Sequence, residues 1–282
     1  MSFSAEWLAL REPVDHRSVS ADLRASVARH FASHAHVRLL DMGCGSGSNL
    51  RGLAPILGPS QHWTLVDWDE GLLAHARAAL SQWADDAQEG ETLTLRKAGK
   101  MIRVDFRKVD LARDLENALD LAPDLITAAA FFDLVSPAWI ARFARAMAQR
   151  RLPLYTVLTY DGREVWSPPH EADAAMLAAF HAHQASDKGF GPAAGPAAAQ
   201  TLAAAFAAEG CDVRRASSPW RMAGGADGAL MSELAKGAAQ AVRETGAVAP
   251  ARIESWLAAR LDASAPARAC EIGHEDVFAL PR

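Results

Sequence analysis

An acidic residue stands two positions before a run of alternating glycines, where segment 39–48 reads LLDMGCGSGS. The apolar residues around Asp41 are typical of a buried strand, and Gly43, Gly45 and Gly47 predict a tight turn that leads into a helix. Because glycine has no side chain, the backbone of such a turn can approach a ligand closely. The carboxylate of Asp41 would attract a cationic ligand group and repel an anionic one.

Two classes of ligand bind where a strand, a glycine turn and a helix start meet: dinucleotides and S-adenosylmethionine. The dinucleotide fingerprint is G-x-G-x-x-G/A, with the pyrophosphate at the helix N-terminus. In this chain Ser48 occupies the third fingerprint position. Asp41 would repel a pyrophosphate, whereas it would attract the ammonium or sulfonium group of S-adenosylmethionine. The turn therefore favours S-adenosylmethionine and leaves a nicotinamide dinucleotide as the alternative.

Acidic residues also end the next expected strands. Segment 62–67 is a short apolar run that ends in Asp67, twenty residues after Gly47, a spacing at which an acid reaches ribose hydroxyls. Segment 109–111 closes a third strand and contains Asp110, near where an adenine amino group would lie. Because open α/β sheets bind ligands outside the carboxyl ends of their strands, we expect these acids to face one crevice.

Over roughly residues 37–160 these motifs resemble the class I S-adenosylmethionine-dependent methyltransferases. The resemblance implies that Asp41, Gly43, Gly45 and Gly47 cradle the methionine part of the cofactor and that Asp67 holds its ribose. It also implies that Trp68 packs on adenine and that Asp110 and Leu111 contact the adenine edge. The fourth-strand segment, Ala128 to Phe132, would lie beside the methyl group.

The N-terminal segment offers one more candidate for the cofactor. Arg17 is placed to reach the cofactor carboxylate, the alternative being a solvated charge at the start of a helix. At residues 131–134 the chain reads FFDL, where families that methylate adenine or amide nitrogen carry Asn/Asp-Pro-Pro-aromatic. Those two reactions are therefore disfavoured.

Methyl transfer from a sulfonium is an in-line displacement, so the protein must align donor and acceptor and exclude water. An oxygen acceptor usually also needs a base, whereas an amine or a thiolate does not always need one. Three residues near the expected methyl position or in the insertion beyond it are catalytic candidates: Asp133, Tyr160 and His170. A loop acid and a packed aromatic are the structural alternatives for the first two. On a helix the side chains of His181 and His183 diverge, so we expect no metal site.

The order of expected elements predicts an α/β fold: a Rossmann-like, seven-stranded, mostly parallel sheet with helices on both faces and a helical cap built from insertions. We expect segment 92–106 to form a hairpin that leads into the third strand. After the fifth strand, Asp161-Gly162 is a turn signal, and residues 163–166 are expected to return as an antiparallel arm. The expected units are an N-terminal helical segment (1–36), a cofactor-binding core (37–160), a cap insertion (161–197), more core (198–222), a helical insertion (223–265) and the last core strand (266–282).

The charge, the cysteine content and the apolar runs of the chain limit the partners and the location that we expect. The chain has 282 residues and a net charge of −5, and it contains no basic run interleaved with aromatic residues, so nucleic acid is not an expected partner. Three widely spaced cysteines, the lack of a signal-peptide pattern and the absence of a long apolar run favour a cytoplasmic protein without a membrane segment. The oligomeric state is left open.

These observations together predict a methyltransferase that moves the methyl group of S-adenosylmethionine to an oxygen, nitrogen or sulfur atom of a small molecule under a helical cap. S-adenosylhomocysteine would be the product. The alternatives are an NAD(P)-dependent oxidoreductase and a non-catalytic protein of the same fold that binds S-adenosylmethionine.

Overall fold

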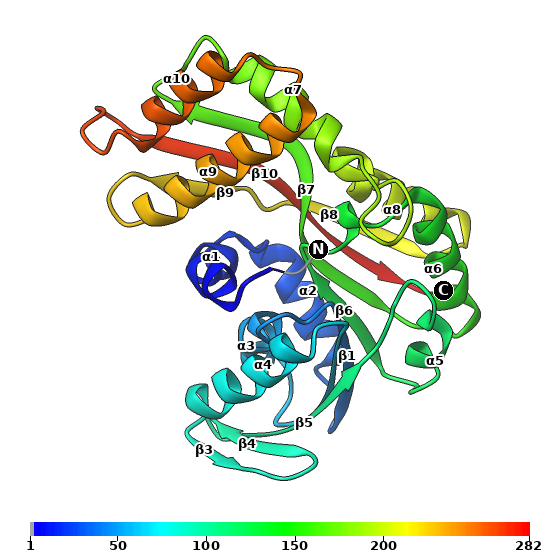
Figure 1. Ribbon diagram of the computed structural model, residues 1–282. Helices are drawn as coiled ribbons and strands as arrows, with labels where there is room; N and C mark the ends of the chain where they lie inside the picture. Colours follow the sequence, from blue (N-terminus) through cyan, green and yellow to red (C-terminus); the bar gives the residue numbers. More distant parts are fainter. Residues whose placement is uncertain (1–2) are drawn as a thin grey trace.

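Ten strands form a single sheet in the computed structural model, which describes residues 3–282 (Figure 1). Their order is β3-β4-β5-β2-β1-β6-β7-β10-β8, and β9 also pairs with β10. The parallel centre consists of β5 (Lys100–Lys108), β2 (Ser60–Asp67), β1 (Val37–Met42), β6 (Leu125–Ala129) and β7 (Leu154–Ser167). At one side β10 (Ala269–Leu280) runs antiparallel between β7 and β8 (Asp212–Ser217). These seven strands form the predicted mostly parallel sheet.

The total of ten strands differs from the seven that the sequence predicts. The additional strands are short: β3 (Asp86–Gln88), β4 (Leu93–Lys97) and β9 (Trp220–Ala223). No residue of β3 is buried, so it lacks the apolar alternation by which a strand is recognised. Edge strands of this kind form because a neighbouring strand offers free backbone groups, which is a property of the sheet rather than of their own sequence.

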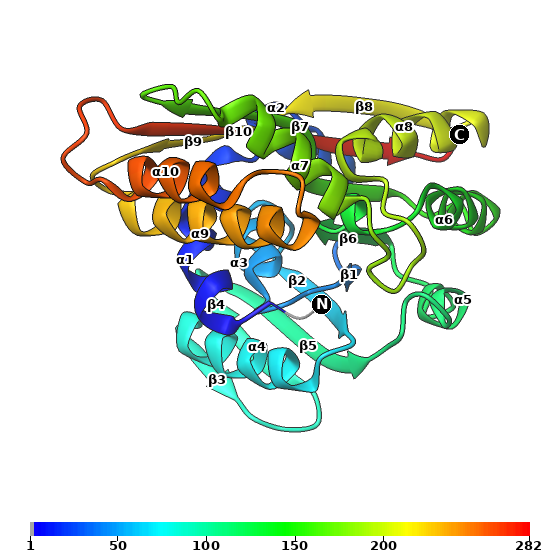
Figure 2. The same cartoon turned by 45° about the horizontal axis from the view of Figure 1, so that its top comes forward.

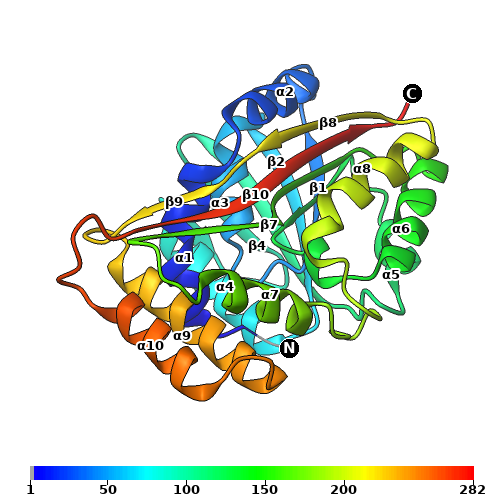
Figure 3. The same ribbon diagram turned by 90° about the horizontal axis from the view of Figure 1, so that it is seen from above.

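Helices cover both faces of the sheet and divide its core in two. Leu39 belongs to one hydrophobic cluster and its neighbour Leu40 to the other, because successive side chains of a strand point to opposite faces. The first face is covered by α2 (Ala21–Phe31), α3 (Ser48–Leu53) and α4 (Glu70–Trp83), and the second by α5 (Leu115–Leu119), α6 (Pro137–Gln149) and α8 (Ala198–Ala208). Figure 3 shows α5, α6 and α8 together on one side of the long strands and α2 on the other.

Three further helices form a cap, the name used below for α7 (Asp173–Gln184), α9 (Gly228–Thr245) and α10 (Pro250–Leu261). They pack against one another over the outer half of β7 and β10 (Figures 1 and 2). At the centre of the cap the buried guanidinium of Arg260 lies 5.4 Å from the ring centroids of both Trp166 and Trp256 and pairs with Asp173. The unit boundaries expected from the sequence remain predictions.

The N-terminal helix α1 (Ala5–Ser18) lies between the cap and α3 (Figure 1). Ser20 is the N-cap of α2, and Ser4 is the N-cap of α1, where its Oγ accepts a hydrogen bond from Trp7 N at 3.2 Å. Pro13 lies inside α1, where a proline normally argues against a helix. None of the helices within residues 3–282 combines the length and the apolar character that a membrane crossing requires.

Two local predictions are wrong. Residues 154–167 form one continuous strand, with no hairpin turn at Asp161-Gly162, because β10 pairs along nearly all of its length. Gly162 has φ +89° and lies where the register shifts between Ile272 and His274, so it bends the strand instead of reversing it. The second arm of the hairpin in segment 92–106 is the third parallel strand itself, and Asp110 follows the end of that strand.

A buried carboxylate connects the last strand to three distant segments. Asp276 of β10 is fully buried and accepts hydrogen bonds from Ser20 N (2.7 Å), Leu158 N (2.9 Å) and Ser218 Oγ (2.6 Å). These bonds connect the start of α2, the middle of β7 and the link between β8 and β9. Each donor would be unsatisfied without the carboxylate.

Replacing this carboxylate should therefore be costly. We expect Asp276→Ala to lower the free energy of unfolding by roughly 3 kcal/mol or more, because buried donors lose their acceptor. The matched control is Glu275→Ala at the neighbouring position, where the lost partner is the surface pair with Arg215 and the expected cost is about 1 kcal/mol or less. Urea denaturation of both variants measures the difference, and equal midpoints would contradict the role given to Asp276.

Candidate functional site

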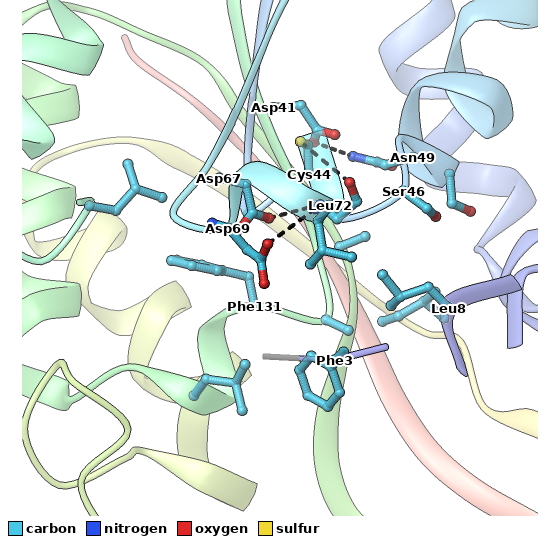
Figure 4. Close-up of a pocket in the computed structure, with 18 of the residues that line it drawn as sticks. Phe3, Leu8, Asp41, Cys44, Ser46, Asn49, Asp67, Asp69, Leu72 and Phe131 are labelled. Carbon is cyan, nitrogen blue, oxygen red and sulfur yellow. Dashed lines mark hydrogen bonds between the residues drawn. The ribbon is translucent and has the colours of Figure 1, made fainter. Parts of the chain in front are cut away.

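A cavity of about 910 Å³ opens at the carboxyl ends of the parallel strands (Figure 4). Seven of the ten predicted cofactor-binding residues line it: Asp41, Gly43, Gly45, Asp67, Trp68, Asp110 and Leu111. They come from the ends of β1, β2 and β5, which are neighbours in the sheet although far apart in sequence. The carboxyl edge of a parallel sheet is where folds of this kind bind ligands.

The other three predicted residues do not line the cavity. Gly47 is the N-cap of α3, and Ala128 is buried within β6, so that Ala129 and Ala130 line the cavity in its place. Arg17 points toward the cap, where its Nη2 donates to Asp227 Oδ2 at 2.7 Å. Its predicted contact with the cofactor carboxylate is therefore not supported by the geometry.

The glycine turn is held open by left-handed backbone. Gly43, Gly45 and Gly47 have φ values of +60°, +51° and +74°, which residues with a side chain rarely adopt. The N–H of Gly45 donates to Asp67 Oδ2 at 3.0 Å, which connects the turn after β1 to the end of β2. A Cβ on Gly43 would lie 2.9 Å from Phe131 Cδ2. The turn thus has neither the conformation nor the space for side chains at this position.

Asp41 is a buried acid with an unused acceptor. Its Oδ1 accepts a hydrogen bond of 2.8 Å from Asn49 Nδ2, which also donates to Thr127 Oγ1, whereas its Oδ2 has no partner. Burial raises the pKa of Asp41 to about 7, an effect opposed by the Asn49 hydrogen bond and increased by the charge of Asp67. A cationic ligand group at Oδ2 would favour the ionised form.

The adenosine side of the cavity carries the other acids. Asp67 Oδ1 accepts from Asp69 N at 3.0 Å, and Asp110 Oδ1 accepts from Ala112 N at 3.0 Å. Each carboxylate has further lone pairs for a ligand, since its two oxygens together accept about four hydrogen bonds. Trp68 is 65% exposed, and Lys108 Nζ lies 5.2 Å from its ring centroid.

The side of the cavity across from these acids was not predicted from the sequence. Phe131, which follows β6, packs nearly perpendicular to Phe190 at a centroid distance of 5.8 Å, and both rings line the cavity. Figure 4 shows Phe3 and Leu8 of the N-terminal segment across from the acids. Other residues that line the cavity and that sequence reasoning missed are Arg11, Asp15, Arg24, Tyr155, Leu158 and Lys188. Their only sequence signal is charge or apolar character, because they come from four separate segments.

The three catalytic candidates are not brought together at the cavity. Asp133 lies in the turn after β6 and is buried, with Oδ2 accepting from Gln184 Nε2 at 3.3 Å and Oδ1 unpartnered. Burial raises the pKa of Asp133 to about 6. The hydroxyl of Tyr160 lies 2.9 Å from His181 Nε2, beneath the cap.

His170 is placed farther into the cap. Its Nδ1 accepts from Ala172 N at 3.1 Å, its backbone N–H donates to Asp173 Oδ2 at 2.8 Å, and its Nε2 lies 3.3 Å from Ser255 Oγ. These contacts support the start of α7 and do not direct the imidazole into the cavity. The geometry therefore gives no support to His170 as a base.

The histidines of α7 point to separate partners. His181 is hydrogen-bonded to Tyr160, whereas His183 Nε2 pairs with Glu244 Oε2 at 2.9 Å. Within residues 3–282 no group of three or more histidine, cysteine or acidic side chains is arranged to hold a metal ion.

Comparisons with known proteins give a structural match and no sequence match. No protein-family model matches the chain, and no curated protein matches its sequence. A cyclopropane-fatty-acyl-phospholipid synthase-like protein from Lactobacillus casei is similar in structure, with a TM-score of 0.53 and 16% identity over 96% of this chain and 99% of that chain. With the strand order, this similarity shows the fold that the sequence predicts, a Rossmann-like, mostly parallel sheet with helices on both faces.

Two more distant structures are an S-adenosylmethionine-dependent methyltransferase from Thiobacillus denitrificans in complex with S-adenosyl-L-homocysteine and the cyclopropane synthase MmaA2 from Mycobacterium tuberculosis. The first has a TM-score of 0.46 and 18% identity, covering 99% of both chains. The second has a TM-score of 0.46 and 14% identity, covering 92% of this chain and 83% of that chain.

The tight contact at Gly43 generates a stability prediction. We expect Gly43→Ala to destabilise the protein by roughly 1–3 kcal/mol more than Gly99→Ala, because the new methyl group must displace the Phe131 ring. Gly99 is the matched control, since its φ is +77° but a Cβ at that position would meet nothing within 4 Å. Thermal unfolding of both variants compares the two costs. Equal shifts in melting temperature would show that the turn has more room than the distances indicate.

Proposed function

We propose that this chain is an S-adenosylmethionine-dependent methyltransferase that acts on a small-molecule acceptor. The observation that carries the proposal is the convergence of Asp41, Asp67 and Asp110 around a left-handed glycine turn in one cavity. Three acids suit a donor with two cationic groups and an adenosine, whereas they would repel the pyrophosphate of a dinucleotide.

The residues present fit the parts of this cofactor. The unpartnered Oδ2 of Asp41 offers an acceptor to the methionine ammonium group. Asp67 would accept from the ribose hydroxyls, while Asp110, Leu111 and Trp68 would surround the adenine. S-adenosylmethionine supplies an activated methyl group. The protein's part is to hold donor and acceptor in line and to exclude water.

The size and closure of the cavity support a small acceptor. Ligand pockets commonly measure about 300–1,000 Å³, so 910 Å³ leaves room for a second small molecule beside the cofactor. Ala129 ends β6, Ala130 and Phe131 follow it, and the three mark the expected position of the methyl group. Phe131 and Phe190 form an apolar wall there, and such a wall keeps water from the reacting atoms.

Asp133 remains the best of the three catalytic candidates. It follows Phe131 by two residues, and its Oδ1 has no hydrogen-bond partner. With a pKa raised to about 6, it would accept a proton near neutral pH if an acceptor hydroxyl came within reach. Tyr160 and His170 have partners within the cap, so we assign them a positioning role.

Calorimetric titration with S-adenosylhomocysteine tests the cofactor assignment. We expect sub-millimolar binding and no comparable binding of reduced nicotinamide dinucleotide. Asp67→Asn should weaken the affinity by about tenfold or more, because the ribose loses a charged acceptor. Asp86→Asn, on the exposed edge strand β3, should leave the affinity unchanged.

A folded protein that does not bind S-adenosylhomocysteine at millimolar concentration refutes the proposal. Binding without methyl consumption in an acceptor screen would favour the non-catalytic alternative.

Binding should also depend on pH through Asp41. Its pKa of about 7 means that the side chain is largely protonated at pH 6 and ionised at pH 8. Because an ammonium group prefers the carboxylate, binding releases a proton, and the affinity for S-adenosylhomocysteine should be about tenfold lower at pH 6 than at pH 8. Asp41→Asn should remove this difference. Calorimetry in buffers of different ionisation enthalpy measures the proton release, and proton uptake at pH 6 would contradict the assignment.

A further inference from the structure

Arg24 of α2 lines the cavity without being paired to an acid. The side chain is half-buried, and its Nη2 donates to the backbone oxygen of Gly52 in α3 at 2.9 Å. Within residues 3–282 this is the one hydrogen bond of the guanidinium, and no carboxylate lies within ion-pair distance of it. Arg11, by contrast, also lines the cavity but is paired with Asp15. The remaining donors of Arg24 are therefore available to an anion.

A buried hydroxyl without a partner lines the same cavity. Tyr155 of β7 is 1% exposed, and its phenolic oxygen has no hydrogen bond to the described part of the chain. Burial and the charge of Asp276 raise the pKa of Tyr155, whereas the charge of Arg24 opposes the rise. The hydroxyl therefore remains protonated and can donate a hydrogen bond to an anionic ligand.

The register of the sheet places Tyr155 in line with Asp41. Asp41 of β1 pairs with Thr127 of β6, and Thr127 pairs with Tyr155 of β7, so all three side chains are on the face that α2 and α3 cover. Asn49 of α3 donates to Asp41 Oδ1 and to Thr127 Oγ1, while Asp41 Oδ2 keeps no partner (Figure 4). The unpartnered carboxylate oxygen and the unpartnered hydroxyl thus belong to residues two strands apart, with about 10 Å between their Cα atoms.

Hydrogen bonds through Asp276 attach α2 to the strand that carries Tyr155. Asp276 accepts from Ser20 N, the N-cap of α2, at 2.7 Å and from Leu158 N in β7 at 2.9 Å. Arg24 follows Ser20 by about one helical turn, and Leu158 follows Tyr155 by three residues. The first turn of α2 is therefore held against the part of β7 that contains Tyr155.

The bond from Arg24 to Gly52 connects the guanidinium to the Asp41 side as well. Gly52 lies about one turn after Asn49 on α3, and both residues line the cavity. Asn49 is the residue that holds the carboxylate of Asp41. The cation, the phenol and the acid are thus joined by hydrogen bonds and strand pairing around one part of the cavity.

We infer that Arg24 and Tyr155 bind the carboxylate of the cofactor's amino-acid end, while Asp41 binds its ammonium group. The inference rests on the proposed function. An α-amino-acid end carries opposite charges a few bonds apart, so it needs an acid and cationic or hydroxyl donors close to one another. Arg24 takes the role predicted for Arg17, which is paired with Asp227. The site then selects a complete amino-acid end over an adenosine thioether that lacks the carboxylate.

Three ligands that share the adenosine test this assignment by calorimetric titration: S-adenosylhomocysteine, its decarboxylated analogue and 5′-methylthioadenosine. We expect wild-type protein to bind the decarboxylated analogue about tenfold more weakly than S-adenosylhomocysteine, because a charge-assisted contact is lost. Arg24→Gln should weaken S-adenosylhomocysteine by about tenfold and the analogue by less than about twofold, and Arg24→Lys should retain part of the affinity. Tyr155→Phe should weaken S-adenosylhomocysteine alone, by about fivefold.

Two further variants separate the carboxylate from the rest of the ligand. Asp41→Asn should weaken S-adenosylhomocysteine and the decarboxylated analogue alike, since both carry the ammonium group, and should leave 5′-methylthioadenosine unchanged. Arg29→Gln, at an exposed position of the same helix, is the matched control and should change none of the three affinities.

Equal affinity of wild-type protein for S-adenosylhomocysteine and its decarboxylated analogue overturns the inference. Equal weakening of both ligands in Arg24→Gln and Tyr155→Phe, or no weakening of either, overturns it as well, because neither side chain would then act on the carboxylate. Tyr155→Phe removes a hydroxyl that has no partner in the described chain, so it is expected to fold even if Arg24→Gln does not. If wild-type protein binds none of the three ligands, the proposed function fails instead.

Discussion

The hydrogen bond from Gly45 N to Asp67 Oδ2 joins the two strand ends on which the site depends. It requires a left-handed backbone at Gly45, and that backbone requires a residue without a side chain. A Cβ at Gly45 would also meet Leu8 of α1 at 3.0 Å. One small turn, which follows β1, is thereby in contact with both the end of β2 and α1. The cavity exists because these three elements meet there without filling it.

Helix α1 connects the region of the glycine turn to the cap through contacts on two sides. Toward the core, Glu12 pairs with Arg51, and His16 Nε2 lies 3.0 Å from the backbone oxygen of Ser48. Toward the cap, Arg17 pairs with Asp227 at 2.7 Å. The helix is therefore attached both to α3 and to the cap, and four of its residues line the cavity: Leu8, Arg11, Asp15 and His16. Polar contacts on several sides hold α1 in place. For this reason its sequence lacks the apolar stripe by which a surface helix is usually recognised.

The buried acids of this protein have different physical states. Asp276 accepts three hydrogen bonds and joins segments of the fold, whereas Asp41 and Asp133 each retain an oxygen without a partner. Unsatisfied buried acceptors are expensive, and the one on Asp41, which lines the cavity, is what a binding site is expected to show. Burial raises the pKa of all three acids, and only their contacts distinguish the structural acid from the two that keep an oxygen without a partner.

Sequence alone determined the central sheet and the glycine turn with its acids, because these depend on local rules: apolar runs, glycine spacing and acids at strand ends. The acids at 41, 67 and 110 do line one cavity. The continuous strand β7, the edge strands and the opposite wall were decided by tertiary structure. Residues such as Arg11 and Lys188 lie far apart in the chain, and no local pattern predicts that both line the cavity; the packing of α1 and the cap against the sheet decides that.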